Sequence, residues 1–205
     1  MEMLPWVFTS GWASGINAYL VVLILGGADR FFQLAQIPDA LARTDVLIIA
    51  GVLFLVDAVA DKVPYVDSTW DAVHTAIRPA IGAAIGALIA GDASSVEQAI
   101  AATAGGATAL ASHAVKAGLR AAVNTSPEPA SNIAVSVGED AAVASIVSLA
   151  IVAPWVAAGI SAVLLFVGMT VVVVLMRRIL TWRRRRRGQT QPGGRGHPAD
   201  EHVSF

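Results

Sequence analysis

Residues 154–187 read PWVAAGISAVLLFVGMTVVVVLMRRILTWRRRRR. An apolar run ends at Met176, and a dense block of arginines follows it. This order is typical of a membrane-spanning helix that ends at an anionic surface, with Trp182 at the depth of the lipid headgroups. It predicts an integral membrane protein with a cytoplasmic C-terminus and anionic lipids bound at Arg183–Arg187.

Composition extends this prediction to the rest of the chain. Of the 205 residues, 56% are hydrophobic and 14% are charged, and the mean hydropathy is +0.66. Soluble domains carry about 25% charged residues. A chain this short has too much surface to hide the apolar surplus in a core, so that surplus must face lipid. We expect an all-α polytopic membrane protein of about five or six elements in the inner (plasma) membrane.

The net charge of −1 conceals an asymmetry. Without the eight arginines from Arg177 onward and the two acids of the tail, six basic residues face thirteen acidic ones. Basic residues gathered at one end orient a membrane protein rather than bind nucleic acid. The chain has no cysteine, which excludes disulfides, thiolate metal sites and cysteine nucleophiles. We expect no cofactor.

The remaining apolar segments predict the other membrane elements. Residues 141–176 are too long for one span, and Pro154 is expected to divide them. Residues 79–90 are too short for one, and form either a half-helix or a span completed by the polar connector 62–78. The other spans are expected at 4–27, 46–60 and 99–119, with loops at 28–45 and 121–140. Residues 1–182 would form the membrane domain, and 183–205 a basic, disordered cytoplasmic tail.

The first span is unusual because its first half is rich in small and polar residues. Such residues mark close helix packing or a broken helix that lines a cavity. Ser14 and Asn17 are candidates to line a break, although hydrogen bonding between packed helices is the commoner use of an asparagine here. A similar pattern recurs at 107–113, which suggests an inverted repeat of the kind found in transporters.

Two groups of ionisable residues flank the second span. Asp57 and Asp61 share one helical face, and Asp57 lies inside an apolar run, which indicates a functional carboxylate or a required ion pair. In the connector, a stripe at helical spacing can line a membrane cavity for proton relay or cation binding, or it can solvate a surface helix. The spacing alone favours the surface helix, with Pro79 starting the next element. The stripe consists of Asp67, Asp71, His74 and Arg78.

Metal binding is a weaker hypothesis for the same stripe. Asp67, Asp71 and His74 offer three ligands from one helical face, a set that suits a divalent cation. No second group of ligands has a diagnostic spacing.

A cationic stripe lies in the fourth span. His113, Lys116 and Arg120 share one face, next to Ser112. They are candidates for an anion or headgroup site or for the counter-ions of Asp57 and Asp61. Alternatively, Lys116 and Arg120 extend to the membrane interface as snorkelling side chains.

Three motifs together resemble a known family. They are SGINAY at residues 14–19, DAVADKVP at 57–64 and DAVHTAIRP at 71–79. The chain resembles, over roughly residues 8–178, a family of small bacterial membrane proteins classed as a domain of unknown function. The resemblance implies a multi-span helical protein and supplies no activity.

The sequence therefore leaves three hypotheses for function. The first is a small transporter or channel-like protein for an ion, a small anionic solute or a lipid headgroup. The second is a scaffold or partner subunit of an envelope complex, either with another membrane protein or as a homo-oligomer. A membrane enzyme is the weakest, because no nucleophile paired with a base and no catalytic motif is present.

Overall fold

The computed structural model describes residues 3–63, 66–123 and 129–189. Side chains near the C-terminus are described as far as Thr181, so the predicted lipid contacts of Arg183–Arg187 lie outside the described residues, as does the part of the predicted tail from residue 190 on. The disorder predicted for residues 183–189 is wrong, because the last helix continues through them. Met1–Val172 form one compact unit. A second unit starts at Val173, within the last helix, and continues that helix to Gln189.

The described residues form six α-helices and one short 3-10 helix, with no strand among them. This confirms the all-α fold. In chain order the elements are α1 (Met3–Phe32), η1 (Asp39–Ala42), α2 (Thr44–Ala60), α3 (Val66–Ala90), α4 (Ser95–Val123), α5 (Pro129–Val152) and α6 (Pro154–Gln189).

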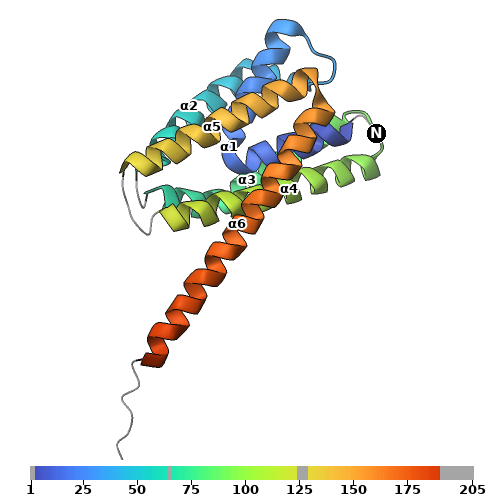
Figure 1. Ribbon diagram of the computed structural model, residues 1–205. Coiled ribbons are helices and arrows are strands. Elements are labelled where there is room, and N and C mark those ends of the chain that lie inside the picture. Colours follow the sequence, from blue (N-terminus) through green and yellow to red (C-terminus); the bar gives the residue numbers. More distant parts are fainter. Residues whose placement is uncertain (1–2, 64–65, 124–128, 190–205) are drawn as a thin grey trace, which may run out of the picture. The chain divides into compact units, whose positions relative to one another are not determined.

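Helix α1 is the centre of the first unit, since it contacts α2, α3, α4 and α5. In Figure 1 it lies between the α3–α4 pair and the α2 and α5 helices. The helix is broken at Asn17, whose backbone angles (φ −146°, ψ 91°) are not helical. The break is one of the two alternatives that the small and polar residues leave open, the other being close helix packing.

Helices α3 and α4 pack closely because glycines face each other across their contact. A Cβ on Gly82 would lie 2.9 Å from the carbonyl oxygen of Gly105, and a Cβ on Gly105 would lie 2.4 Å from that of Gly82. Facing small residues let membrane helices approach until their backbones touch. The same short distance brings the polar faces of both helices toward α1.

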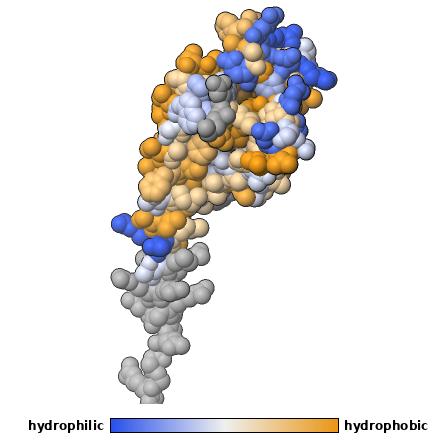
Figure 2. Space-filling view, turned by 90° about the vertical axis from the view of Figure 1, so that its right-hand side faces the viewer, coloured by the Kyte–Doolittle hydropathy of each residue, from blue (hydrophilic) through white to orange (hydrophobic). Residues whose placement is uncertain are grey.

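The bundle places apolar side chains outside and charged ones inside. Large hydrophobic residues are exposed along α2 and α6, among them Ile48, Leu55, Val59, Val163 and Phe166. Figure 2 shows hydrophobic residues over much of one face and hydrophilic residues mainly toward the upper right of the view, with a smaller group lower down. Four helices are long and apolar enough to cross a membrane: α1, α3, α5 and α6. The protein is a polytopic helical membrane protein.

The predicted boundaries have mixed outcomes. Pro154 separates α5 from α6, as predicted. Residues 66–78 of the connector and residues 79–90 form one helix, so Pro79 lies inside α3 rather than at a helix start. The loop predicted at 121–140 is wrong, because α5 begins at Pro129. Its first turns are polar because they face a polar interior rather than solvent. Similarly, α1 continues to Phe32, which shortens the predicted loop at 28–45.

Candidate functional site

The predicted polar stripes meet inside the bundle. Asp67, Asp71, His74 and Arg78 are buried on one face of α3, so the surface helix favoured by their spacing is wrong. That face packs against α1 and α4, which bring polar groups of their own. Nine ionisable side chains there are at most 3% exposed: Asp57, Asp61, Asp67, Asp71, His74, Arg78, His113, Lys116 and Arg120.

Arg78 holds two of these carboxylates at once. Its guanidinium lies 3.0 Å from Asp57 Oδ1 and 3.0 Å from Asp71 Oδ1. Asp57 Oδ1 also accepts a hydrogen bond from Trp70 Nε1 at 2.6 Å. We call Arg78, Asp57, Asp71 and His113 the Arg78 cluster. It joins the end of α2 to the middle of α3 and α4.

The neighbours of His113 determine its tautomer. Nδ1 lies 3.2 Å from Arg78 Nη1, which can only donate, so Nδ1 accepts. Nε2 therefore carries the proton and donates to the carbonyl oxygen of Asp71 at 3.1 Å. His113 is neutral in this arrangement.

His74 is held as the other tautomer, with the proton on Nδ1. Nδ1 lies 2.8 Å from the carbonyl oxygen of Trp70, which can only accept. In the neutral ring Nδ1 therefore donates, and Nε2 accepts from the Tyr19 hydroxyl at 2.9 Å. The Tyr19 ring also meets the His74 ring edge-on. His74 thus connects α3 to α1.

A second group surrounds Asp61, and we call Asp61, Lys116, Arg120 and Glu139 the Asp61 cluster. Lys116 Nζ lies 2.5 Å from Asp61 Oδ2, and Arg120 Nη2 lies 3.4 Å from the same oxygen. Arg120 also donates to the carbonyl oxygen of Asp61 at 2.7 Å and to Glu139 Oε2 at 2.8 Å. Lys116 and Arg120 are counter-ions of Asp61, as one alternative predicts, and not snorkelling side chains.

The break in α1 lies against the Asp61 cluster. Leu20 N donates to the Asn17 side-chain oxygen at 3.0 Å, and the carbonyl oxygen of Ile16 accepts from Lys116 Nζ at 3.1 Å. Asn17 Nδ2 donates to Asp140 Oδ1 on α5 at 2.8 Å. The break therefore turns the carbonyl oxygen of Ile16 toward the buried ammonium group of Lys116.

Carboxylates outnumber cations in this network. Among the described residues the two clusters and Asp67 contribute five carboxylates (Asp57, Asp61, Asp67, Asp71 and Glu139) and three lysine or arginine side chains (Arg78, Lys116 and Arg120). A buried charge without a partner costs several kcal/mol, so a surplus of this kind favours the uptake of protons or other cations.

Several buried oxygens have no hydrogen-bond partner among the described residues. They include the second carboxylate oxygen of three acids, Asp57 Oδ2, Asp61 Oδ1 and Asp71 Oδ2. The hydroxyl oxygen of Ser14, which is fully buried, also has no hydrogen-bond partner among the described residues. The three carboxylate oxygens can accept a proton, and all four oxygens can contribute to holding a cation.

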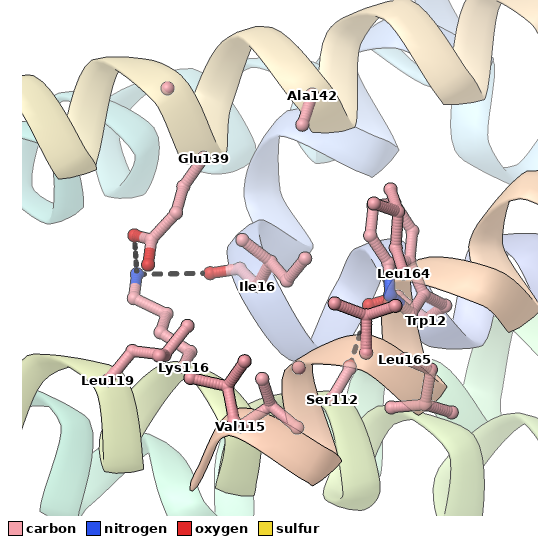
Figure 3. A pocket seen from close by; sticks show the side chains of 14 residues that line it. Trp12, Ile16, Ser112, Val115, Lys116, Leu119, Glu139, Ala142, Leu164 and Leu165 are labelled. Carbon is pink, nitrogen blue, oxygen red and sulfur yellow. Dashed lines mark hydrogen bonds and ion pairs between the residues drawn. The ribbon is translucent and has the colours of Figure 1, made fainter. Parts of the chain in front are cut away.

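A cavity of about 360 Å³ adjoins the Asp61 cluster (Figure 3). Its lining comes from α1, α4, α5 and α6 and is apolar except at one end, where Lys116 and Glu139 face each other with 3.6 Å between Nζ and Oε2. Trp12 and Ser112 belong to the lining, and Ser112 donates to the carbonyl oxygen of Trp12 at 2.7 Å.

The metal hypothesis gains no support from the arrangement. In 3–63, 66–123 and 129–189, no group of three or more histidine or acidic side chains is placed to hold a metal ion. Asp71 instead pairs with Arg78, and His74 is occupied by Trp70 and Tyr19.

Sequence reasoning missed Glu139 as a site residue because it assigned the residue to a loop. A signal was present. Buried residues on α5 recur at helical spacing from the polar to the apolar end of the helix, at Asn132, Ser136, Val143, Val147 and Ala150. A stripe at this spacing indicates a helix that begins before residue 141 and contains Glu139.

Comparison with known proteins identifies one family. A family model described as a domain of unknown function (DUF4126) matches residues 4–174, which include every residue of both clusters. The family resemblance drawn from the three motifs is thereby confirmed. No curated protein and no solved structure matches this chain.

Proposed function

The chain belongs to the family of the domain of unknown function DUF4126, and from this premise we propose that it is a small membrane transporter or channel-like protein for a cation, coupled to protons at its buried carboxylates. The description of the family states no activity, so we infer the function from the buried site. The observation that carries the proposal is the surplus of buried carboxylates over lysine and arginine side chains in the described part of the bundle.

The surplus of carboxylates bears on function because it makes the buried network an acceptor of protons and other cations. Five carboxylates and three cations leave two negative charges to neutralise if every acid is ionised. Protons and other cations would compete for that charge, and competition for one site is the simplest form of coupling. The unpartnered oxygens of Asp57 and Asp61 are the proposed points of uptake.

The remaining residues have supporting roles in this proposal. Asn17 and Ser14 line the break in α1. Lys116 donates a hydrogen bond to the carbonyl oxygen of Ile16, which the break turns inward. His74 and His113 connect α3 to α1 and α4, respectively, and hold the side chains around Arg78 in place.

A cation fits the site better than an anionic solute or headgroup. Lys116 and Arg120 are engaged by Asp61 and Glu139. An anion would have to displace a carboxylate from each of them, and it would enter a network whose net charge is already negative. A cation meets neither obstacle at the oxygens without a hydrogen-bond partner, Asp57 Oδ2, Asp61 Oδ1 and Asp71 Oδ2.

Proton movement in proteoliposomes tests the proposal. With the membrane voltage clamped, inorganic and organic cations are added outside, and an internal pH dye is followed. We expect wild type to move protons and Asp57→Asn, Asp61→Asn and His113→Ala to lose most of the signal. Asp45→Asn is the matched control: Asp45 is an exposed acid of α2, and Arg43, at 2.7 Å, lowers the pKa of Asp45 to about 2. Flux that persists in the buried-site variants would reject the roles of these residues.

A scaffold subunit is the alternative, and one observation favours it. Arg78 is shared by two carboxylates and Asp61 by two cations, as in ion pairs that hold a bundle together. Under this alternative, affinity purification yields a stoichiometric membrane partner or a homo-oligomer, and reconstituted protein moves no protons.

We also propose a location and an organisation for the chain. The exposed apolar helices contact lipid, and the inner (plasma) membrane, with a cytoplasmic C-terminus, suits the arginine block at 183–187. Residues 1–182 would then be the membrane domain and 183–205 a basic accessory tail.

A further inference from the structure

The cavity beside the Asp61 cluster has the composition of a binding site for an amphiphile. Most of its walls are hydrophobic side chains, among them Trp12, Ile16, Val115 and Leu119. At about 360 Å³ it falls within the range of small-molecule pockets. Figure 3 shows Glu139 and Lys116 together at one end of it and Leu164 and Leu165 at the other.

The cavity is open to the outside of the bundle along α6. Leu164 and Val167 belong to its lining and are nevertheless 41% and 50% exposed. Because these residues lie in a helix apolar enough to cross a membrane, an opening on this side would face lipid. A ligand can enter from the bilayer with its apolar part against these walls.

The charged end selects the sign of the ligand. Lys116 has three N–H donors, and three oxygens surround them: Asp61 Oδ2 at 2.5 Å, the Ile16 carbonyl at 3.1 Å and Glu139 Oε2 at 3.6 Å. The side chain of Lys116 is 2% exposed, whereas that of Glu139 is 15% exposed. The more exposed of the two charged groups is therefore the carboxylate, which a ligand would share with Arg120, 2.8 Å from Oε2.

We propose that this cavity binds an amphiphilic organic cation, with its positive head at Glu139 and its apolar body between α4, α5 and α6. This names the substrate class for the proposed function and rests on it, because the cation would join the network whose surplus charge competes for protons. Binding itself requires no transport and can be measured alone.

Two ions of the same shape and opposite charge make the test specific. Purified protein in detergent is dialysed to equilibrium against radiolabelled tetraphenylphosphonium or tetraphenylborate. We expect saturable binding of the cation and none of the anion. Glu139→Gln keeps the shape and removes the charge, and should weaken cation binding about tenfold or more. Equal binding of both ions, or cation binding unchanged in Glu139→Gln, would overturn the proposal in favour of an apolar pocket for lipid chains.

A second pair of variants is independent of the ion pairs. Gly138 lines this cavity and has nothing within 4 Å of the position of a Cβ, so Gly138→Leu fills the cavity without an initial clash. Gly159 is equally open but lines a different cavity, which makes Gly159→Leu the matched control. We expect Gly138→Leu to abolish cation binding and Gly159→Leu to retain it. The proposal fails if both variants bind as wild type does.

The two proposals can fail separately. If wild type binds no tetraphenylphosphonium but still moves protons in a manner that depends on Asp57, the cavity proposal is wrong and the proposed function stands. If the cation binds at Glu139 and no flux is seen, binding is established and transport is not.

Discussion

Lys116 and Asp61 are 55 residues apart in the chain, yet Lys116 Nζ lies 2.5 Å from Asp61 Oδ2 and both side chains are almost completely buried. The pair ties α4 to the end of α2 at the edge of the amphiphile cavity. Removing one member of such a pair leaves an unpaired charge inside the bundle.

The first prediction follows from this pair. Lys116→Met should lower the free energy of unfolding by about 3–5 kcal/mol, because Asp61 keeps only the more distant Arg120 side chain. The double variant Asp61→Asn/Lys116→Met should recover more than half of that loss, since neither buried charge remains. Unfolding by sodium dodecyl sulfate in mixed micelles measures both. Additive penalties would mean that the two side chains are not coupled.

The second prediction concerns the contact of α1 with α4. A Cβ on Gly15 would lie 1.8 Å from Ser112 Oγ and 2.2 Å from the carbonyl oxygen of Ala109, so Gly15→Ala must separate the helices. We expect a loss of at least about 1–3 kcal/mol in the same unfolding assay. Gly27→Ala is the control on the same helix, because a Cβ there meets nothing within 4 Å. Equal stability of the two variants would contradict this packing.

The third prediction addresses the break in α1. Asn17→Asp keeps an oxygen for Leu20 N but sets a second carboxylate against Asp140, which is 2.8 Å away. Two carboxylates at this distance cannot both be ionised, so the variant should be less stable than wild type at neutral pH. Its deficit should shrink as the pH falls and the pair takes up a proton. Melting temperatures across pH measure this, and a deficit independent of pH would count against the contact.

The fourth prediction concerns the start of α4. Ser94 N and Oγ donate to Glu97 Oε2, and Glu97 N donates to Ser94 Oγ, which forms a capping box. The hydrogen bonds from Ser94 hold the pKa of Glu97 below its ordinary value. Their stabilisation is present above that ordinary value and is lost as the pH falls through the lowered pKa.

Ser94→Ala should therefore destabilise the protein at neutral pH, and the difference from wild type should diminish in acid. Thermal unfolding followed by circular dichroism at several pH values is the measurement. Ser95→Ala, at an exposed position one residue later, is expected to show no such pH dependence. A Ser94→Ala penalty that is constant with pH would exclude the role of Glu97.

The fifth prediction concerns orientation. A fluorescent protein fused to the C-terminus should fluoresce in a bacterial host, whereas an alkaline phosphatase fusion at the same point should be inactive. This follows from the arginines at 183–187, which favour the cytoplasmic side. Replacing the five arginines with glutamine should weaken the preference. An active phosphatase fusion to the unaltered chain would reverse the proposed topology.

The features predicted from sequence are those that depend on neighbours in the chain. Pro154 cannot continue the hydrogen bonds of the preceding helix, so the boundary between α5 and α6 follows from its position. The small and polar residues around Asn17 indicate close helix packing or a broken helix in the same local way. The shared faces of Asp57 with Asp61 and of His113 with Lys116 follow from helical spacing alone.

Features that depend on distant parts of the chain were predicted less well. The spacing of Asp67, Asp71, His74 and Arg78 favours a solvated face, and only the packing of α3 against α1 and α4 shows that this face is buried. Likewise, the polar start of α5 resembles a loop unless a polar interior is known to lie opposite it.

Thus the sequence by itself determined the kind of protein: a helical membrane protein whose apolar surplus must face lipid and whose ionisable residues lie on a few helical faces. Only the tertiary structure decided the partners, giving Asp57 to Arg78, Asp61 to Lys116 and Arg120, and Glu139 to the end of a cavity. The reason is physical. Helical periodicity is set by the backbone within a few residues, whereas an ion pair between helices depends on how closely glycines such as Gly15 and Gly105 let their backbones approach.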